Sequence, residues 1–195
     1  SCVTTVRKST WAVWPCLNSF VNSSRLALLD RDGTLIEHVH YLSDPAQVRL
    51  LPQTVEGLLA LKRLNFRLVL VSNQSGVGRG YFDEASVRAV NERMQELLRP
   101  HGAELELMLF CPHSPQDNCS CRKPGTGMAE QACQLLGATL EGAIVVGDSD
   151  CDMGLAQALG VAGYRVGTPE LPGLAGLLHQ LQGSLHTDGG QKASA

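Results

Sequence analysis

Two carboxylates stand one residue apart directly after a short apolar run, and this pair is the part of the sequence best suited to chemistry. Asp30 and Asp32 follow residues 26–29, whose composition predicts a buried strand. Successive side chains of a strand point to opposite faces, so both carboxylates can share a site only if the chain bends, which Gly33 permits. Carboxylates held this close repel each other unless a cation lies between them. The pattern therefore predicts a cation site at a strand end, and a strand followed by an ordinary polar turn is the alternative.

A third carboxylate is expected to join this pair. Asp148 follows another apolar run, residues 143–146, which also predicts a buried strand. Asp30, Asp32 and Asp148 would then converge from two strand ends and offer the oxygen ligands that Mg²⁺ prefers, with room for water and phosphate oxygens. Asp148 could instead be an ordinary helix cap.

Groups able to hold a phosphate are also present. Ser72 follows the apolar run 67–71, and its hydroxyl and the ammonium of Lys123 are both suited to phosphate oxygens. A carboxylate nucleophile, an acid/base, a metal and donors for the transferred group make up the machinery of phosphoryl transfer, in which water hydrolyses an aspartyl-phosphate. Taken singly, the serine could satisfy a turn and the lysine could lie at the surface.

The elements that must position these groups alternate between strands and helices. Strands are expected at residues 26–29, 67–71, 105–110, 143–146 and 162–166. Helices are expected between them, and Thr168-Pro169 is expected to open a last helix that carries Leu174, Leu177, Leu178 and Leu181. The alternation predicts a Rossmann-like, three-layer α/β/α fold around a mostly parallel sheet. Ligands of such sheets bind at the carboxyl ends of the strands, where these polar clusters fall.

A compact cluster of cysteines and one histidine predicts a second metal site. Three thiols and an imidazole lie within eleven positions at Cys111, His113, Cys119 and Cys121. Such a ligand set is typical of a closed, tetrahedral and structural Zn²⁺ site, and a reduced cysteine-rich loop without metal is the alternative. Cys133 and Cys151 fall on predicted helices, where we expect them to pack against apolar neighbours.

Composition limits the remaining possibilities. The 195 residues carry a formal net charge of −3, and no basic stripe suggests a nucleic-acid partner. No apolar run approaches the roughly 20 residues needed to cross a bilayer, so no membrane association is expected. The seven cysteines, odd in number and unevenly placed, favour a reducing compartment, and we expect a cytoplasmic monomer.

One main domain is expected at residues 25–183. Residues 1–24 would form an N-terminal extension of unassigned role, and residues 184–195, rich in Gly, Ser, Lys and Ala, a disordered tail. The extension contains no acidic residue, which leaves a transit peptide as an alternative to an extra packed segment.

Four short motifs resemble those of the haloacid dehalogenase superfamily of phosphatases. They are Asp30-Arg31-Asp32-Gly33-Thr34, Ser72-Asn73-Gln74, Arg122-Lys123-Pro124 and Gly147-Asp148-Ser149-Asp150-Cys151-Asp152. Over residues 26–181 the chain resembles in particular the D-glycero-D-manno-heptose-1,7-bisphosphate 7-phosphatases, with histidinol-phosphate phosphatases as near relatives. Both families carry a zinc loop, which here would lie directly before Arg122 and Lys123, so that Zn²⁺ would fix the loop that aims these two cations. The short intervals between motifs leave no room for a large cap domain.

The resemblance implies a role for each motif. Asp30 would be the nucleophile and Asp32 the general acid/base, while Ser72 and Lys123 would steady the phosphoryl group. Mg²⁺ would be held by Asp30, the carbonyl of Asp32, and Asp148. Substrate contacts would come from Arg31, His38, Val39, His40, Tyr41, Asn73, Gln74, Ser75 and Arg122. The chain departs from the family at Ser149, where a basic residue is common.

The substrate implied is a small phosphorylated sugar, and three alternatives stay open. The stretch 75–82 and Gly127-Met128 look more like the heptose branch than the histidinol-phosphate branch. A dinucleotide-binding domain would need a third glycine where Tyr81 stands. A non-catalytic phospho-receiver would need neither Asp32 as acid/base nor a zinc loop.

Overall fold

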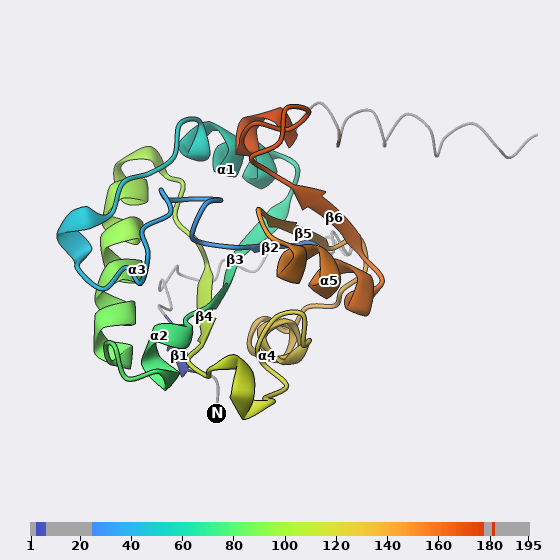
Figure 1. Ribbon diagram of the computed structural model, residues 1–195. Helices are drawn as coiled ribbons and strands as arrows, with labels where there is room; N and C mark the ends of the chain where they lie inside the picture. The colour runs from blue at the N-terminus through green and yellow to red at the C-terminus, as the bar shows by residue number, and fades with distance from the viewer. Residues whose placement is uncertain (1–2, 7–24, 178–180, 182–195) are drawn as a thin grey trace, which may run out of the picture.

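A computed structural model describes residues 3–6, 25–177 and 181 and shows a six-stranded sheet between two layers of helices (Figure 1). The strand order is β1-β4-β3-β2-β5-β6, and all neighbours are parallel except β1 and β4. The strands are β1 (Val3–Val6), β2 (Arg25–Leu29), β3 (Phe66–Asn73), β4 (Leu107–Cys111), β5 (Ile144–Gly147) and β6 (Ala162–Arg165). The predicted α/β fold with a mostly parallel sheet is confirmed.

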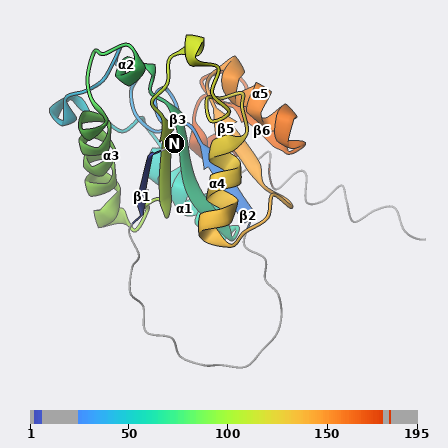
Figure 2. The same cartoon turned by 90° about the horizontal axis from the view of Figure 1, so that it is seen from below.

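Alternation along the buried strands decides which helices cover each face. The α-helices are α1 (Thr54–Arg63), α2 (Ser75–Gly78), α3 (Glu84–Leu98), α4 (Gly127–Leu136) and α5 (Asp150–Leu159). In β2, Ala27 and Leu29 belong to the core that α1 and α3 cover, whereas Leu26 and Leu28 belong to the core under α4 and α5. Figure 2 shows α3 on one side of the sheet and α4 and α5 on the other. Because β2 is buried on both faces, it is apolar throughout residues 26–29.

The order in which successive strands are added to the sheet changes direction at β2. The chain passes from β2 to β3 and β4 on one side, and then returns to β5 and β6 on the other. β2 and β5 are thus parallel neighbours, while the helices that follow them, α1 and α5, cover opposite faces. In open parallel sheets the crevice at such a switch point is where ligands bind. Asp30 and Asp148 follow the two strands that border it.

Two segments differ from the sequence-based expectation. Val3–Val6, within the extension of unassigned role, forms an edge strand antiparallel to β4. The predicted helix start at Thr168-Pro169 is wrong, because Thr168 and Leu171 exchange backbone hydrogen bonds in a turn and the Thr168 hydroxyl accepts from the Leu171 N–H. A 3-10 helix begins only at Leu174. Leu178, the rest of residues 1–24 and the tail 184–195 lie outside the described residues.

The crevice is not covered by a second domain in the described part of the chain. Residues 30–53, between β2 and α1, contain a single 3-10 helix, Pro45–Gln47, and residues 74–83 contain only the one-turn α2. Within the same described ranges, no helix is long and apolar enough to span a membrane.

Candidate active site

The end of β2 brings Asp30 against β5. The Asp30 N–H donates to the carbonyl of Val146 at 2.9 Å, which continues the strand pairing by one residue. The chain then turns at Gly33, which has a φ of +79°, and a Cβ at this position would overlap the Asp148 carboxylate. Only glycine meets both demands without strain. The bend predicted from Gly33 is therefore also a point of close approach between two motifs.

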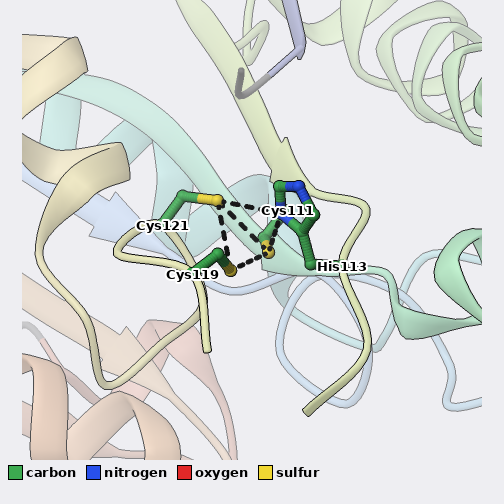
Figure 3. A group of neighbouring side chains, drawn as sticks. All are labelled: Cys111, His113, Cys119 and Cys121. Carbon is green, nitrogen blue, oxygen red and sulfur yellow. Dashed lines mark hydrogen bonds between the residues drawn. The ribbon is translucent and has the colours of Figure 1, made fainter. Parts of the chain in front are cut away.

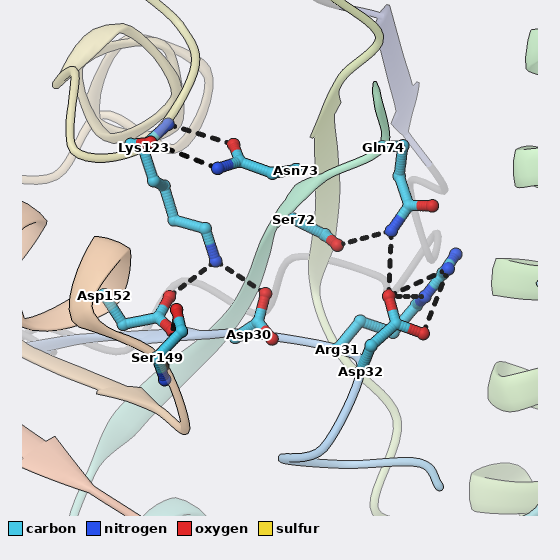
Figure 4. A network of polar contacts seen from close by, with 9 residues as sticks. All are labelled: Asp30, Arg31, Asp32, Ser72, Asn73, Gln74, Lys123, Ser149 and Asp152. Atoms are coloured by element: carbon cyan, nitrogen blue, oxygen red, sulfur yellow. Dashed lines mark hydrogen bonds and ion pairs between the residues drawn. The ribbon is translucent and has the colours of Figure 1, made fainter. Parts of the chain in front are cut away.

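Lys123 lies between two buried carboxylates (Figure 4). Its Nζ is 2.5 Å from Asp30 Oδ1 and 2.6 Å from Asp152 Oδ1. Burial by itself lowers the pKa of Lys123, but the two carboxylates together raise it above its ordinary value. Burial raises the pKa of Asp30 to about 6, although Lys123 opposes that shift. The ammonium is therefore charged at neutral pH and is shared between two acidic groups.

Three carboxylates gather around this single ammonium. Asp30, Asp148 and Asp152 each have an oxygen within 4.8 Å of the others. Burial, followed by the charge of Asp152, raises the pKa of Asp148. Three acidic groups beside one ammonium leave the cluster short of positive charge. The donor set is thus hard oxygen with a negative balance, which fits a divalent cation such as Mg²⁺.

Asp152 was missed as a site residue by the sequence analysis. It is fully buried, and both of its oxygens already accept hydrogen bonds: Oδ1 from Lys123, and Oδ2 from the backbone N–H and hydroxyl of Ser149. These contacts suit Asp152 to holding Lys123 better than to binding a metal. Ser149 and Asp152 form a capping box at the start of α5, and this Ser-x-x-Asp spacing was visible in the sequence. It also explains why serine serves where the resemblance led us to expect a basic residue.

The second aspartate of the motif has different surroundings. The Asp32 carboxylate accepts from Arg31 Nε at 3.1 Å and Nη2 at 3.2 Å, and from Gln74 Nε2 at 2.9 Å. The same Gln74 amide lies 2.8 Å from the Ser72 hydroxyl. Asp32 is therefore oriented by side chains from two strand ends, and its carboxylate is turned toward them.

Asn73 connects the end of β3 to the backbone of Lys123. Its Oδ1 accepts from the Lys123 N–H at 2.9 Å, and its Nδ2 donates to the Lys123 carbonyl at 3.1 Å. β3 runs two residues further than predicted, and its last two residues pair with Phe110 and Cys111 of β4. Asn73 is thus held by the sheet while it fixes the loop that carries the lysine.

A cavity of about 340 Å³ joins these groups. Its lining includes every predicted catalytic, magnesium and substrate residue: Asp30, Arg31, Asp32, His38, Val39, His40, Tyr41, Ser72, Asn73, Gln74, Ser75, Arg122, Lys123 and Asp148. Ser149 and Cys151 also line it. The expectation that Cys151 packs in the core was wrong, because the first turn of α5 faces the crevice. Cys133 does pack against the core under α4.

The cavity has an aromatic side. The ring centroids of His40 and Tyr41 are 4.2 Å apart, and those of Tyr41 and Tyr81 are 4.6 Å apart, both edge to face. A Cβ at Gly76 would overlap Phe82 and press against Tyr41. The glycine-rich stretch thus lets α2 pack closely under this aromatic group.

The predicted zinc ligands lie together (Figure 3). The three sulfur atoms are 3.4 to 3.5 Å apart, and His113 Nδ1 is 3.5 Å from the sulfur of Cys111 and 3.3 Å from that of Cys121. Zn–S bonds of about 2.3 Å in a tetrahedron place sulfur atoms about 3.8 Å apart, which is close to this spacing. The soft thiolates and one imidazole fit Zn²⁺.

The loop that carries this cluster packs against the active site. The Gln74 N–H donates to the Cys111 carbonyl and the Gly78 N–H to the Pro112 carbonyl, both at 2.8 Å. A Cβ at Gly78 would press against the backbone of Ser114. The glycine-rich stretch therefore supports the loop that carries the cluster.

Residues 25–162 match the family described as polynucleotide kinase 3 phosphatase. The chain belongs to this haloacid dehalogenase-like family. The match spans all four motifs noted in the sequence, and the recognised superfamily is confirmed. The chain is accordingly a phosphoric monoester hydrolase of the haloacid dehalogenase type.

Two kinds of protein are among the relatives of this haloacid dehalogenase-like chain. A D-glycero-beta-D-manno-heptose-1,7-bisphosphate 7-phosphatase of Pseudomonas aeruginosa is 36% identical over 70% of this chain and 78% of its own. The histidine biosynthesis bifunctional protein HisB of Campylobacter jejuni is also 36% identical, over 74% of this chain but only 42% of its own. A crystal structure of D,D-heptose 1,7-bisphosphate phosphatase from B. bronchiseptica, complexed with magnesium and phosphate, has a TM-score of 0.74 and 31% identity. That likeness covers 82% of this chain and 99% of the other.

Proposed function

We propose that the chain hydrolyses the 7-phosphate of D-glycero-D-manno-heptose 1,7-bisphosphate through an aspartyl-phosphate on Asp30. The observation that carries the chemistry is the buried contact of 2.5 Å between Lys123 and Asp30 at the floor of the cavity. A buried ammonium beside a carboxylate keeps the carboxylate ionised and leaves positive charge where phosphate oxygens would lie. The sugar is suggested by the heptose bisphosphatase relatives, which match this chain over most of their length.

Each step of the proposed reaction uses a named side chain. An Asp30 oxygen attacks phosphorus, and the bond to the leaving oxygen breaks while Asp32 gives that oxygen a proton. Water then attacks the phosphorus of the aspartyl-phosphate, Asp32 takes the proton of that water, and phosphate leaves with Asp30 restored. Ser72 and Lys123 hold the oxygens of the transferred group throughout.

The cation would be held by Asp30 and Asp148, with the carbonyl of Asp32 as a third ligand. Mg²⁺ bound there would offset the negative charge of the phosphate and of the carboxylates. Asp152 would stay bound to Lys123 and Ser149, as its satisfied oxygens suggest. Asp148 and Asp152, which belong to the same motif, would thus have different roles, because Asp148 would bind the cation and Asp152 would hold Lys123.

Substrate selection would come from residues around an open cavity. Arg122 is half-buried, and its Nη1 makes a long contact of 3.4 Å with the His113 carbonyl. Its planar fork can hold a second phosphate. The sugar would lie against the segment His38–Tyr41, whose aromatic rings present apolar edges and faces. A bisphosphate could then use its distant phosphate to orient the reacting one.

We also propose that Cys111, His113, Cys119 and Cys121 bind a structural Zn²⁺. The spacing of their ligand atoms and their softness support this metal over Mg²⁺. The ion would hold the loop that ends at Arg122 and Lys123. Elemental analysis of protein purified under reducing conditions tests the site, and a preparation with reduced thiols and no zinc would rule it out.

A substrate panel tests the proposed function. Heptose 1,7-bisphosphate, histidinol phosphate and a 3′-phosphorylated oligonucleotide would be compared with wild type and with Asp30→Asn, which removes the nucleophile. We expect the heptose bisphosphate to have the highest kcat/KM and Asp30→Asn to be inactive. Preference for histidinol phosphate would select the activity suggested by the HisB relative, and turnover by Asp30→Asn would exclude the covalent mechanism.

A further inference from the structure

Arg31 is a charged side chain buried beside the catalytic carboxylates. Its exposed fraction is 1%, and it is among the largest fully buried side chains of the described chain. A buried guanidinium is costly unless its charge and its N–H groups have partners. Its partners here are Asp32 and Asn91, so its position is fixed by those contacts.

The contacts of Arg31 form a line from helix α3 to Asp32. Nε and Nη2 reach the two oxygens of Asp32, while Nη1 donates to Asn91 Oδ1 at 2.9 Å. Asn91 is itself 3% exposed and lies in the middle of α3. Val90 and Met94 on either side of it are fully buried in the core. Helix α3 therefore sets the plane of the guanidinium through Asn91. The guanidinium in turn sets the plane of the Asp32 carboxylate, a contact that Figure 4 shows.

These contacts give Arg31 a role beside the substrate contact that the resemblance implied, since Arg31 also lines the cavity. Every side-chain nitrogen of Arg31 already donates within the protein: Nε and Nη2 to Asp32, and Nη1 to Asn91. The fork of Arg31 is thus used to hold a carboxylate of the protein. Arg122, by contrast, is half-buried at the cavity wall, and among residues 3–6, 25–177 and 181 its side chain makes one long hydrogen bond, through Nη1.

We propose that Asn91 is a positioning residue for proton transfer to the leaving group. It holds Arg31 in the plane that aims Asp32, and Arg31 stabilises the carboxylate that remains after Asp32 has given up its proton. In that step the electrons of the broken phosphorus–oxygen bond go to the leaving oxygen, which takes the proton from Asp32. The inference rests on the proposed function, in which Asp32 is the general acid.

The role has a consequence that a purely structural residue would not have. A poor leaving group, such as the alcohol of a sugar phosphate, needs a proton as its bond breaks, whereas 2,4-dinitrophenolate does not. Misplacing Asp32 should therefore slow cleavage of the sugar phosphate and spare cleavage of 2,4-dinitrophenyl phosphate. The quantity kcat/KM reports the first irreversible step, so the later hydrolysis of the aspartyl-phosphate does not obscure the comparison.

The experiment compares kcat/KM for the two esters in wild type, Asn91→Leu and Asn91→Asp. Leucine keeps the branched shape of the side chain but removes the acceptor, and aspartate keeps an acceptor oxygen at the same place. General acid catalysis contributes about 100- to 10,000-fold, so we expect Asn91→Leu to lose about 10-fold or more on heptose bisphosphate. Its loss on the dinitrophenyl ester should stay within about 3-fold, and Asn91→Asp should recover most of the difference.

The matched control is Gln95→Leu, one turn further along α3. Gln95 is also a buried amide, but it bonds the backbone of Leu105 and not the active site. The Gln95→Leu substitution should lower the stability of the protein without changing the ratio of the kcat/KM values for the two esters. If Asn91→Leu does not fold, Arg31→Lys replaces it, because lysine keeps the charge but cannot contact Asp32 and Asn91 through a fork.

Equal losses on both esters, or no loss on either, would overturn the positioning role. That result is distinguishable from failure of the proposed function. If only the positioning role fails, the wild-type protein still turns over both esters and its activity depends on Asp30. If the proposed function fails, the wild-type protein is inactive or the Asp30→Asn variant remains active.

Discussion

Lys123→Met keeps most of the length of the unbranched side chain and removes its charge from between two carboxylates. The exposed fraction of the side chain is 2% for Lys123, 11% for Asp30 and 0% for Asp152. Removing one partner of a buried ion pair costs about 3–5 kcal/mol, because the remaining charge stays buried without compensation. We expect the free energy of unfolding at pH 7 to fall by about that amount.

The loss in the free energy of unfolding should depend on pH, and the pKa of Asp30 determines the direction of that dependence. Its pKa is about 6 in the folded protein and 3.8 in the unfolded chain, so between these values the folded state binds more protons. The stability contributed by this carboxyl therefore rises as the pH falls through 6, and the gain is complete below 3.8. For wild type this amounts to roughly 1 kcal/mol between pH 7 and pH 5. Lys123 lowers the pKa of Asp30, so the variant should gain more than wild type over the same interval.

Urea denaturation at pH 7 and pH 5 measures both effects, in buffer without Mg²⁺ and without a chelator that would remove zinc. Lys62→Met is the matched control, because Lys62 is exposed and its ammonium donates to the Gly102 carbonyl and to no carboxylate of the described residues. Its effect should stay within about 0.5 kcal/mol at both pH values. A Lys123→Met protein as stable as wild type at pH 7, or equally destabilised at both pH values, would contradict the buried charge cluster.

Three further predictions concern metals and substrate. Mg²⁺ affinity, measured by calorimetry, should weaken as the pH falls through about 6, because Asp30 must lose its proton to bind the ion; constant affinity from pH 7 to pH 5 would exclude Asp30 as a ligand. Cys119→Ser should lower the zinc content and the activity together, and unchanged zinc content would remove Cys119 from the site. Arg122→Ala should reduce kcat/KM for the heptose bisphosphate about 10- to 150-fold, the equivalent of about 1.5–3 kcal/mol, and spare an ester without a second phosphate; equal losses would assign Arg122 to the reacting phosphate.

The sequence predicted the features that depend on local pattern. Residues 26–29 and 143–146 were expected to be buried strands, and the structure confirms both. The convergence of Asp30 and Asp148 followed from the rule that parallel strands present their carboxyl ends at one edge. The clustering of Cys111, His113, Cys119 and Cys121 was predictable because these residues are close in sequence and distinctive in type.

The pairing of side chains was not predictable in the same way. Nothing local to Arg31 indicates that it turns toward Asn91, which lies 60 residues further along and depends on how α3 packs on the sheet. Asp152 was passed over because one helix turn separates it from Asp148, and only the packing of α5 decides which of them meets Lys123. Thr168-Pro169 was misjudged because the same residues that can start a helix can also close a turn.

The position of Lys123 relative to Asp30 is set from several sides at once. The Asn73 amide holds the backbone of Lys123 to the sheet, and Cys121 ties the chain two residues earlier to the thiol cluster. Asp152 then holds the ammonium from α5. A long, flexible side chain would otherwise sample many rotamers, so these restraints reduce the entropy lost when the phosphoryl group is bound. The loop of Cys111, His113, Cys119 and Cys121, and the Zn²⁺ proposed to bind there, can therefore affect catalysis without touching the substrate, because this loop determines where the ammonium lies.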